Sequence, residues 1–65
     1  MELKFVYKGK NSDVLLIVDT EKKHFIYWTD IEVEDSIKAV FVKSRKDIKF
    51  ILDTVFNNGY ALKIS

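Results

Sequence analysis

The amino-terminal part of the chain alternates between apolar and polar residues in a way that predicts β-strands. Residues 2–8 (ELKFVYK) follow the two-residue period of a strand with one buried side. The run 14–18 (VLLIV) is apolar on both sides and predicts a central strand. The polar stretches 9–13 and 19–23 separate these runs and predict tight turns.

Residues 24–33 (HFIYWTDIEV) predict a third strand with two different sides. One side carries Phe25, Tyr27, Thr29, Ile31 and Val33, and the other carries His24, Ile26, Trp28, Asp30, Glu32 and Glu34. The second half is amphipathic and sets the register of the first half, so Ile26 and Trp28 are expected to point away from the core. Residues 34–36 predict a turn, and residues 37–43 predict a fourth strand.

A helix is predicted to follow Ser44. The Ser44 hydroxyl is placed to accept a hydrogen bond from the first turn, and Asp47 completes a capping-box pattern. One apolar stripe contains Ile48, Ile51, Leu52, Val55 and Phe56. Phe50 lies on the opposite face among charged residues, and Gly59 is the expected left-handed residue after the helix.

Residues 60–64 predict a last strand, with Tyr60, Leu62 and Ile64 facing inward. A strand, a helix and a strand in close succession predict a right-handed crossover that makes the fourth and fifth strands parallel. The predicted fold is therefore α+β: a mixed, mostly antiparallel five-stranded sheet with one helix packed on one face. The chain order is four strands, a helix and a strand, in a single globular domain spanning 1–65. The alternative is a small curled β-barrel with one helix.

One helix cannot cover both faces of such a sheet. Val6, Ile26 and Trp28 are left on the face without the helix, and each large apolar side chain in water forgoes roughly 1.5–3 kcal/mol of burial. Three arrangements resolve the conflict: closure into a barrel, sheet-to-sheet packing of two copies, or a binding surface for another molecule.

Composition restricts the class of protein. The chain has 65 residues and no cysteine, which excludes disulfides and thiolate metal sites. Residues 1–10 lack the apolar core of a secretion signal, no run reaches membrane-spanning length, and the net charge is +1. We expect a cytoplasmic protein without a membrane partner. The Lys-, Ile-, Phe- and Asn-rich composition is typical of AT-rich genomes and suggests an accessory protein of a phage or a low-GC bacterium.

Few residues suit catalysis or metal binding. His24 is the only histidine, so neither a metal site nor a His-based catalytic triad is expected. The acidic run 30–35 (DIEVED) is similar to the start of a calcium loop, but Asp35 stands where the loop needs glycine. We interpret the run as a solvated strand face. The sequence therefore predicts no catalytic residue, no metal, no cofactor and no enzyme.

A basic group precedes and begins the helix. It consists of Lys43, Arg45, Lys46 and Lys49. With Phe50 as a stacking ring, this group would suit a nucleic acid, although the spacing of Lys49 and Asp53 also allows a helical salt link. The other interpretation makes Phe50 the anchor of a protein partner at the outer face of the helix.

The sequence thus favours a small non-catalytic protein-interaction module that forms a homodimer through the open sheet face around Ile26 and Trp28. Across that interface, Asp30, Glu32 and Glu34 are expected to meet Lys4 and Lys8. The alternative is a nucleic-acid-binding accessory protein that uses the basic group.

Overall fold

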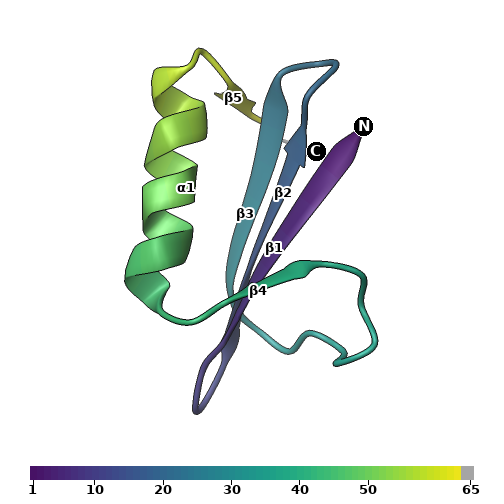
Figure 1. Ribbon diagram of the computed structural model, residues 1–65, viewed down its shortest axis with the longest axis vertical. Helices are drawn as coiled ribbons and strands as arrows, with labels where there is room; N and C mark the ends of the chain where they lie inside the picture. Colours follow the sequence, from purple (N-terminus) through teal and green to yellow (C-terminus); the bar gives the residue numbers. More distant parts are fainter. Residues whose placement is uncertain (64–65) are drawn as a thin grey trace.

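The computed structural model describes residues 1–63, which form five strands and one helix (Figure 1). The elements are β1 (Glu2–Lys8), β2 (Asp13–Asp19), β3 (His24–Ile31), β4 (Val40–Val42), α1 (Arg45–Asn57) and β5 (Ala61–Leu62). This order confirms the predicted α+β class. The expected strand 60–64 is described only at 61–62, and Ile64 lies outside the described residues.

The sheet has the strand order β4-β1-β2-β3-β5. β1, β2 and β3 form an antiparallel meander, β4 pairs parallel to β1, and β5 pairs parallel to β3. The fourth and fifth strands point in the same direction, as predicted, and they lie on opposite edges of the sheet, so they do not pair with each other. Because β2 lies in the middle of the meander, only the outer edges of β1 and β3 are free to receive another strand.

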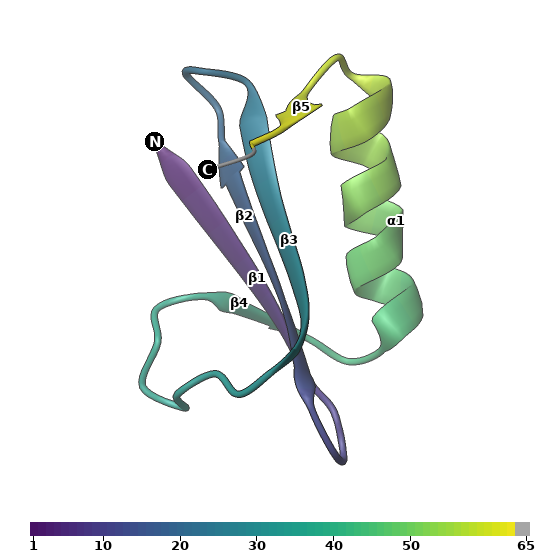
Figure 2. The same ribbon diagram turned by 180° about the vertical axis from the view of Figure 1, so that it is seen from behind.

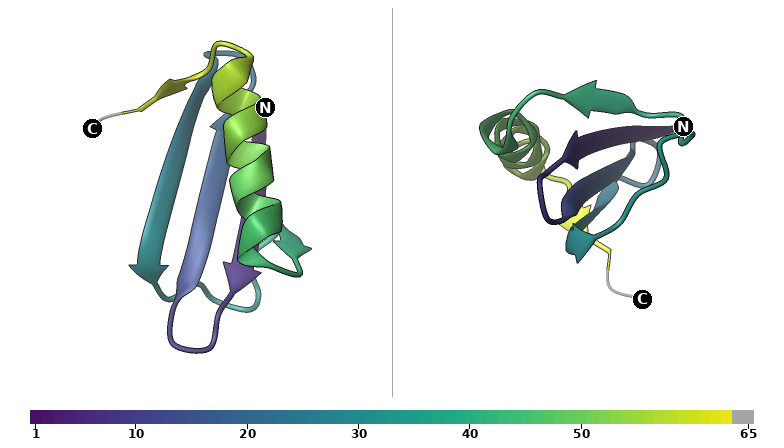
Figure 3. Two further views of the ribbon diagram at one scale, coloured as in Figure 1. Left: turned by 90° about the vertical axis from the view of Figure 1, so that its left-hand side faces the viewer. Right: turned by 90° about the horizontal axis from the view of Figure 1, so that it is seen from below.

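The sheet is not closed into a barrel over the described residues, since β4 and β5 form its two opposite edges. The barrel alternative is therefore wrong. The helix covers one face of the sheet, which we call the helix side (Figure 3). It packs mainly against β2, β1 and β4.

The other face is covered by a segment that the sequence did not predict. β3 ends at Ile31, and residues 32–39 then cross this face to reach β4 on the far edge (Figures 1 and 2). We call residues 32–39 the strap and this face the strap side. The expected turn at 34–36 is present within the strap, where the Ile37 amide donates to the Glu34 carbonyl at 3.2 Å. The expected strand 37–43 is shorter than predicted and spans only residues 40–42.

A β-bulge near the end of β3 decides which side chains reach the strap side. Leu15 lies opposite Trp28, but Asp13 lies opposite Ile31, so β3 contains one extra residue there. Asp30 adopts the left-handed conformation with φ of 57°. The extra residue moves Ile31 to the side of Trp28, so the predicted grouping of Ile31 and Val33 with Phe25 and Tyr27 is wrong.

The sheet consequently has an apolar cluster on each face. On the helix side the buried residues are Val14, Leu16, Val18, Phe25 and Ile48. On the strap side they are Val6, Leu15 and Val33, with Ile17, Ile31, Ile37 and Ala39 packed against them. The strap thus buries part of the apolar surface for which one helix is insufficient.

The ends of α1 follow the local signals of the sequence. The Asp47 amide donates to Ser44 Oγ at 3.3 Å, which confirms the predicted cap. At the other end Gly59 has φ of 86°, and the Tyr60 amide donates to the Val55 carbonyl at 3.1 Å. These contacts form a Schellman motif and stop the helix where predicted.

The carboxy-terminal turn of α1 is less buried than the apolar stripe of the sequence had predicted. Ile48 is buried, but Phe56 is 65% exposed and Leu62 of β5 is 53% exposed, so the expectation that both face inward is wrong. The helix lies over β1 and β2 and leaves the β3 edge beside it uncovered (Figure 3). Phe56 faces this uncovered side, where it lines an open groove of about 240 Å³ together with Tyr27 and Leu62.

Candidate interaction surface

The part of the strap side that the strap leaves uncovered carries the predicted interaction residues. Ile26 lies opposite Ile17 and both are half-buried, whereas Trp28 lies opposite Leu15 and is 52% exposed. Phe41, paired with Val6 on the same face, is 45% exposed. The sequence analysis did not select Phe41. The available signal was its position between Val40 and Val42, because alternate residues of a strand point to opposite faces.

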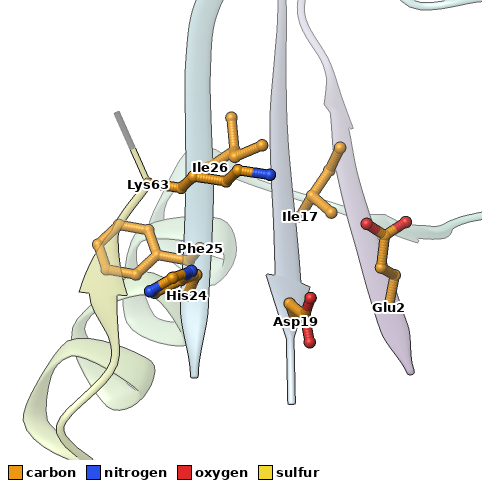
Figure 4. Close-up of a pocket in the computed structure, with 7 residues that line it drawn as sticks. All are labelled: Glu2, Ile17, Asp19, His24, Phe25, Ile26 and Lys63. Carbon is orange, nitrogen blue, oxygen red and sulfur yellow. The ribbon is translucent and has the colours of Figure 1, made fainter. Parts of the chain in front are cut away.

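One end of this surface carries both signs of charge, because Lys4 and Lys63 lie there beside Ile17 and Ile26 and share the face with Glu2 and Asp19 (Figure 4). Lys4 stands on β1 opposite Ile17. The Lys63 side chain reaches from the end of β5 past Ile26 toward β2 (Figure 4). Its aliphatic stem covers apolar surface while the ammonium stays in water. The hollow beside it is about 20 Å³, enough for a water molecule but not for a ligand.

The other end is acidic, and we define its acidic half as Trp28, Ile31, Glu32, Glu34 and Ile37. These residues line an open pocket of about 540 Å³, together with Leu15, Val33 and Ser36. Glu32 and Glu34 are exposed and, within residues 1–63, neither pairs with a cation. An apolar floor with an acidic rim suits an apolar partner that also carries positive charge.

The strap is held in place by a buried carboxylate. Asp13 is 5% exposed, and its Oδ2 accepts hydrogen bonds from Lys8 Nζ and from the Val33 amide, each at 2.8 Å. Lys8 also donates to the Val33 carbonyl and pairs with Asp35 at 3.2 Å. Asp13 therefore binds the strap to the β1–β2 hairpin.

These contacts shift the protonation equilibria of both groups. The hydrogen bond from Lys8, and next that from the Val33 amide, lower the pKa of Asp13. The hydrogen bond to Asp13, and next that to Asp35, raise the pKa of Lys8. Since Lys8 is engaged within its own chain, it is not placed to meet the acidic row of another copy, and of the predicted pair only Lys4 remains for that role.

The outer face of α1 carries the other predicted residues. Phe50 is 73% exposed, and Lys43, Arg45, Lys46 and Lys49 are all exposed. In the part of the chain that the structure describes, none of these four cations has an acidic partner, and the possible salt link between Lys49 and Asp53 is not formed. Phe50 and the basic group thus form a separate surface on the opposite side of the sheet.

The described part of the chain contains no cluster suited to metal chemistry. Among residues 1–63, no three His, Asp or Glu side chains converge to hold a metal ion. His24 is half-buried at the end of the sheet, near Glu2 and Asp19 (Figure 4). The helix in the described part of the chain is too short and too polar to cross a membrane.

No protein-family model, no curated protein and no solved structure matches this chain. The function proposed below is therefore inferred from the geometry of the molecule's own surfaces.

Proposed function

We propose that the chain is a small, non-catalytic interaction module of the cytoplasm that self-associates through the strap side. The observation that carries the proposal is the apolar surface that the strap leaves uncovered on β3 and β2. Trp28 is 52% exposed there, and half-buried Ile26 and Ile17 lie beside it. Phe41, which is 45% exposed, lies on the same face beyond the buried Val6 and Leu15. Exposed apolar patches of this kind usually mark interaction sites, and aromatic residues are enriched in them.

Size supports a homodimer as the form of this association. A chain of 65 residues buries only about 60% of the surface of its unfolded form, and with no cysteine it has no disulfide to add stability. Burial of Trp28 and Ile26 against a second copy would compensate for the small core. Closed two-fold dimers are by far the commonest soluble oligomers.

The test is the solution mass, measured by light scattering after size exclusion over a range of protein concentrations at low and high salt. We expect a dimer that persists at high salt, because apolar association does not weaken there. Trp28→Glu should yield a monomer. Phe50→Glu is the matched control, since it places the same charge at an exposed aromatic residue on the other side of the molecule, and it should remain dimeric. A Trp28→Glu chain that stays dimeric would contradict the proposed interface.

A second candidate function, nucleic-acid binding, is favoured by the basic group. Arg45, Lys46 and Lys49 lie near the positive end of the helix dipole, where cations destabilise the helix, and they lack acidic partners within residues 1–63. Residues that oppose local stability often serve a function. Phosphates would stabilise this arrangement of charge, and Phe50 lies beside it for stacking on a base.

Fluorescence anisotropy with a single-stranded oligonucleotide tests this candidate. Lys46→Glu with Lys49→Glu should abolish binding, whereas Lys22→Glu with Lys23→Glu, in the β2–β3 turn, should retain most of it. Binding should also weaken steeply as salt rises. Equal binding by the two double variants would eliminate the candidate.

A further inference from the structure

The turn that ends α1 and leads to β5 contains the pair Asn58–Gly59 (Figure 1). Gly59 has φ of 86°, which a residue with a side chain rarely adopts, so the helix cap itself favours a glycine directly after Asn58. Glycine also leaves its own backbone nitrogen sterically unhindered. The geometry that stops the helix therefore places the least hindered kind of backbone nitrogen next to an asparagine side chain.

An asparagine followed by a glycine can react with its own main chain. The Gly59 nitrogen attacks Cγ of Asn58, the bond from Cγ to Nδ2 breaks, and ammonia leaves with the proton of the Gly59 nitrogen, so that a five-membered succinimide ring remains. Water then opens the ring at either of its two carbonyl groups. One product is aspartate, and the other is isoaspartate, in which the main chain runs through Cβ and Cγ. Both residues are exposed, so water reaches the ring.

The folded turn holds the two reacting groups apart. Asn58 has ψ of 15°, which turns the Gly59 nitrogen towards the main-chain nitrogen of Asn58 and away from its side chain. The Gly59 amide donates to the Phe56 carbonyl at 3.2 Å, and Asn58 Nδ2 donates to the Thr54 carbonyl at 2.7 Å. Both hydrogen bonds must break before the ring can close, so the reaction requires the last turn of α1 to open.

From this arrangement we infer that Asn58 is a site of spontaneous covalent modification, that its rate is set by the opening of the last turn of α1, and that the product lacks the native helix cap. Either product loses the hydrogen bond from Nδ2 to Thr54 and places a carboxylate beside the carbonyl groups at the negative end of the helix dipole. Isoaspartate also lengthens the main chain before Gly59 and displaces the amides of Gly59 and Tyr60 from their acceptors in the helix.

The consequence reaches β5, which follows the turn directly. Two residue pairs join β5 to β3, and the Ala61 and Lys63 amides donate to the Lys23 and Phe25 carbonyls. Loss of the turn removes the fixed connection between these contacts and the helix. The modified chain should therefore loosen at the end of α1 and at β5, while the meander of β1, β2 and β3 stays intact.

Peptide mapping by mass spectrometry tests the site. The chain contains three asparagines and no glutamine, so a deamidated product comes from Asn11, Asn57 or Asn58. We expect Asn58 to react first, and more slowly than in a peptide of residues 54–62 by about tenfold or more, because two hydrogen bonds must break in the folded chain. Equal rates in the chain and in the peptide would overturn the control by the fold. Earlier reaction at Asn11 or Asn57 would overturn the site.

Two substitutions at Asn57, the last residue of α1, test the role of the opening. Asn57→Lys stabilises the negative end of the helix dipole and Asn57→Glu destabilises it, so the folded Glu variant should react about threefold or more faster than the folded Lys variant. Peptides 54–62 with the same two substitutions are the matched controls and should differ less. Equal rates in the two folded variants, or no product at Asn58 in the Glu variant, would refute the inference.

Hydrogen exchange of the purified isoaspartate form tests the consequence. Exchange should accelerate at the Tyr60, Ala61 and Lys63 amides and stay unchanged at the Leu16 amide. Asn58→Asp is the control, since it has the side chain of the aspartate product with an unaltered main chain, and its acceleration should be smaller. An isoaspartate form that exchanges like the unmodified chain would show that the reaction does not remove the cap.

Discussion

The two faces of the sheet bury apolar residues by different means. On the helix side, α1 satisfies its own backbone hydrogen bonds, and the Ser44 cap and the motif at Gly59 complete its ends. On the strap side, the covering segment has no regular structure, and the buried Val33 amide depends on the Asp13 carboxylate. A buried polar group needs a partner, so a cover without regular structure needs a side chain to provide one. The strap is therefore sensitive to a single carboxylate, and the helix is not.

The largest expected effect comes from truncating the helix-side core. Leu16 is fully buried, so Leu16→Ala should reduce the free energy of unfolding by about 2–5 kcal/mol. Ile37 in the strap is only half-buried, and Ile37→Ala should reduce it by about 1 kcal/mol. Urea denaturation measures both values. Equal losses would show that the strap contributes as much stability as the helix layer.

The next effect is local release of the strap by Asp13→Asn. The amide oxygen can still accept hydrogen bonds, but it carries no charge to attract Lys8, so the strap should loosen while α1 stays packed. Hydrogen exchange should accelerate at the Val33 amide more than at the Leu16 amide. Asp53→Asn, a change at an exposed helix position, is the control. Equal acceleration of exchange in both layers would show that Asp13 does not hold the strap independently of the helix side.

Acid should weaken the same contacts of Asp13 with Lys8 and Val33. The pKa of Asp13 is lower in the folded chain than in the unfolded chain, so its contribution to stability is present above the unfolded pKa and is lost as the pH falls through the folded pKa. The raised pKa of Lys8 gives the opposite dependence, with stability lost as the pH rises through the folded value.

Melting temperature measured against pH separates the contributions at the acid end. Asp19 accepts hydrogen bonds from the Lys22 and Glu21 amides, which lower its pKa, so it also contributes there. Asp13→Asn should remove the strap part of the acid dependence, and Asp19→Asn should remove the turn part. If the melting temperature of the Asp13→Asn chain falls as much in acid as that of the unchanged chain, protonation of Asp13 does not contribute to the acid dependence.

The smallest expected effect is a gain. Lys46→Glu replaces a cation near the positive end of α1 with an anion and should stabilise the chain by about 0.3–1 kcal/mol at low salt. Lys22→Glu, outside the helix, should leave stability nearly unchanged. If the Lys46→Glu chain is more stable and also binds the oligonucleotide less tightly, the basic group serves binding rather than folding.

The helix side was largely predictable because its signals are local. Ser44, Asp47 and Gly59 set the ends of the helix through contacts between neighbours in sequence, and these contacts do not depend on the sheet under the helix. The exposure of Phe56 was not predictable in this way, since it depends on which strands the helix covers. Periodicity shows which helix residues are apolar and not how far the helix extends over the sheet.

The strap side was less predictable because it depends on one backbone angle and one distant contact. The left-handed conformation of Asp30 reverses the sides of Ile31 and Val33, and aspartate tolerates that conformation without requiring it. Asp13 and Val33 are separated by 20 positions, so no local pattern connects them. Ile26 and Trp28 were placed on the correct face by alternation, but Lys63 reached that face only through the pairing of β5 with β3.

β2 lies at the centre of the sheet, and it is the one strand among the described residues that contributes buried side chains to both layers. Leu16 packs toward the helix, and Leu15 packs toward the strap. Neither layer can melt without disturbing this shared strand, so the molecule should unfold as one cooperative unit. Any molecule that binds only the folded form stabilises that whole unit by mass action. A second copy seated on the strap side would therefore slow hydrogen exchange at Leu16, whose side chain it never touches.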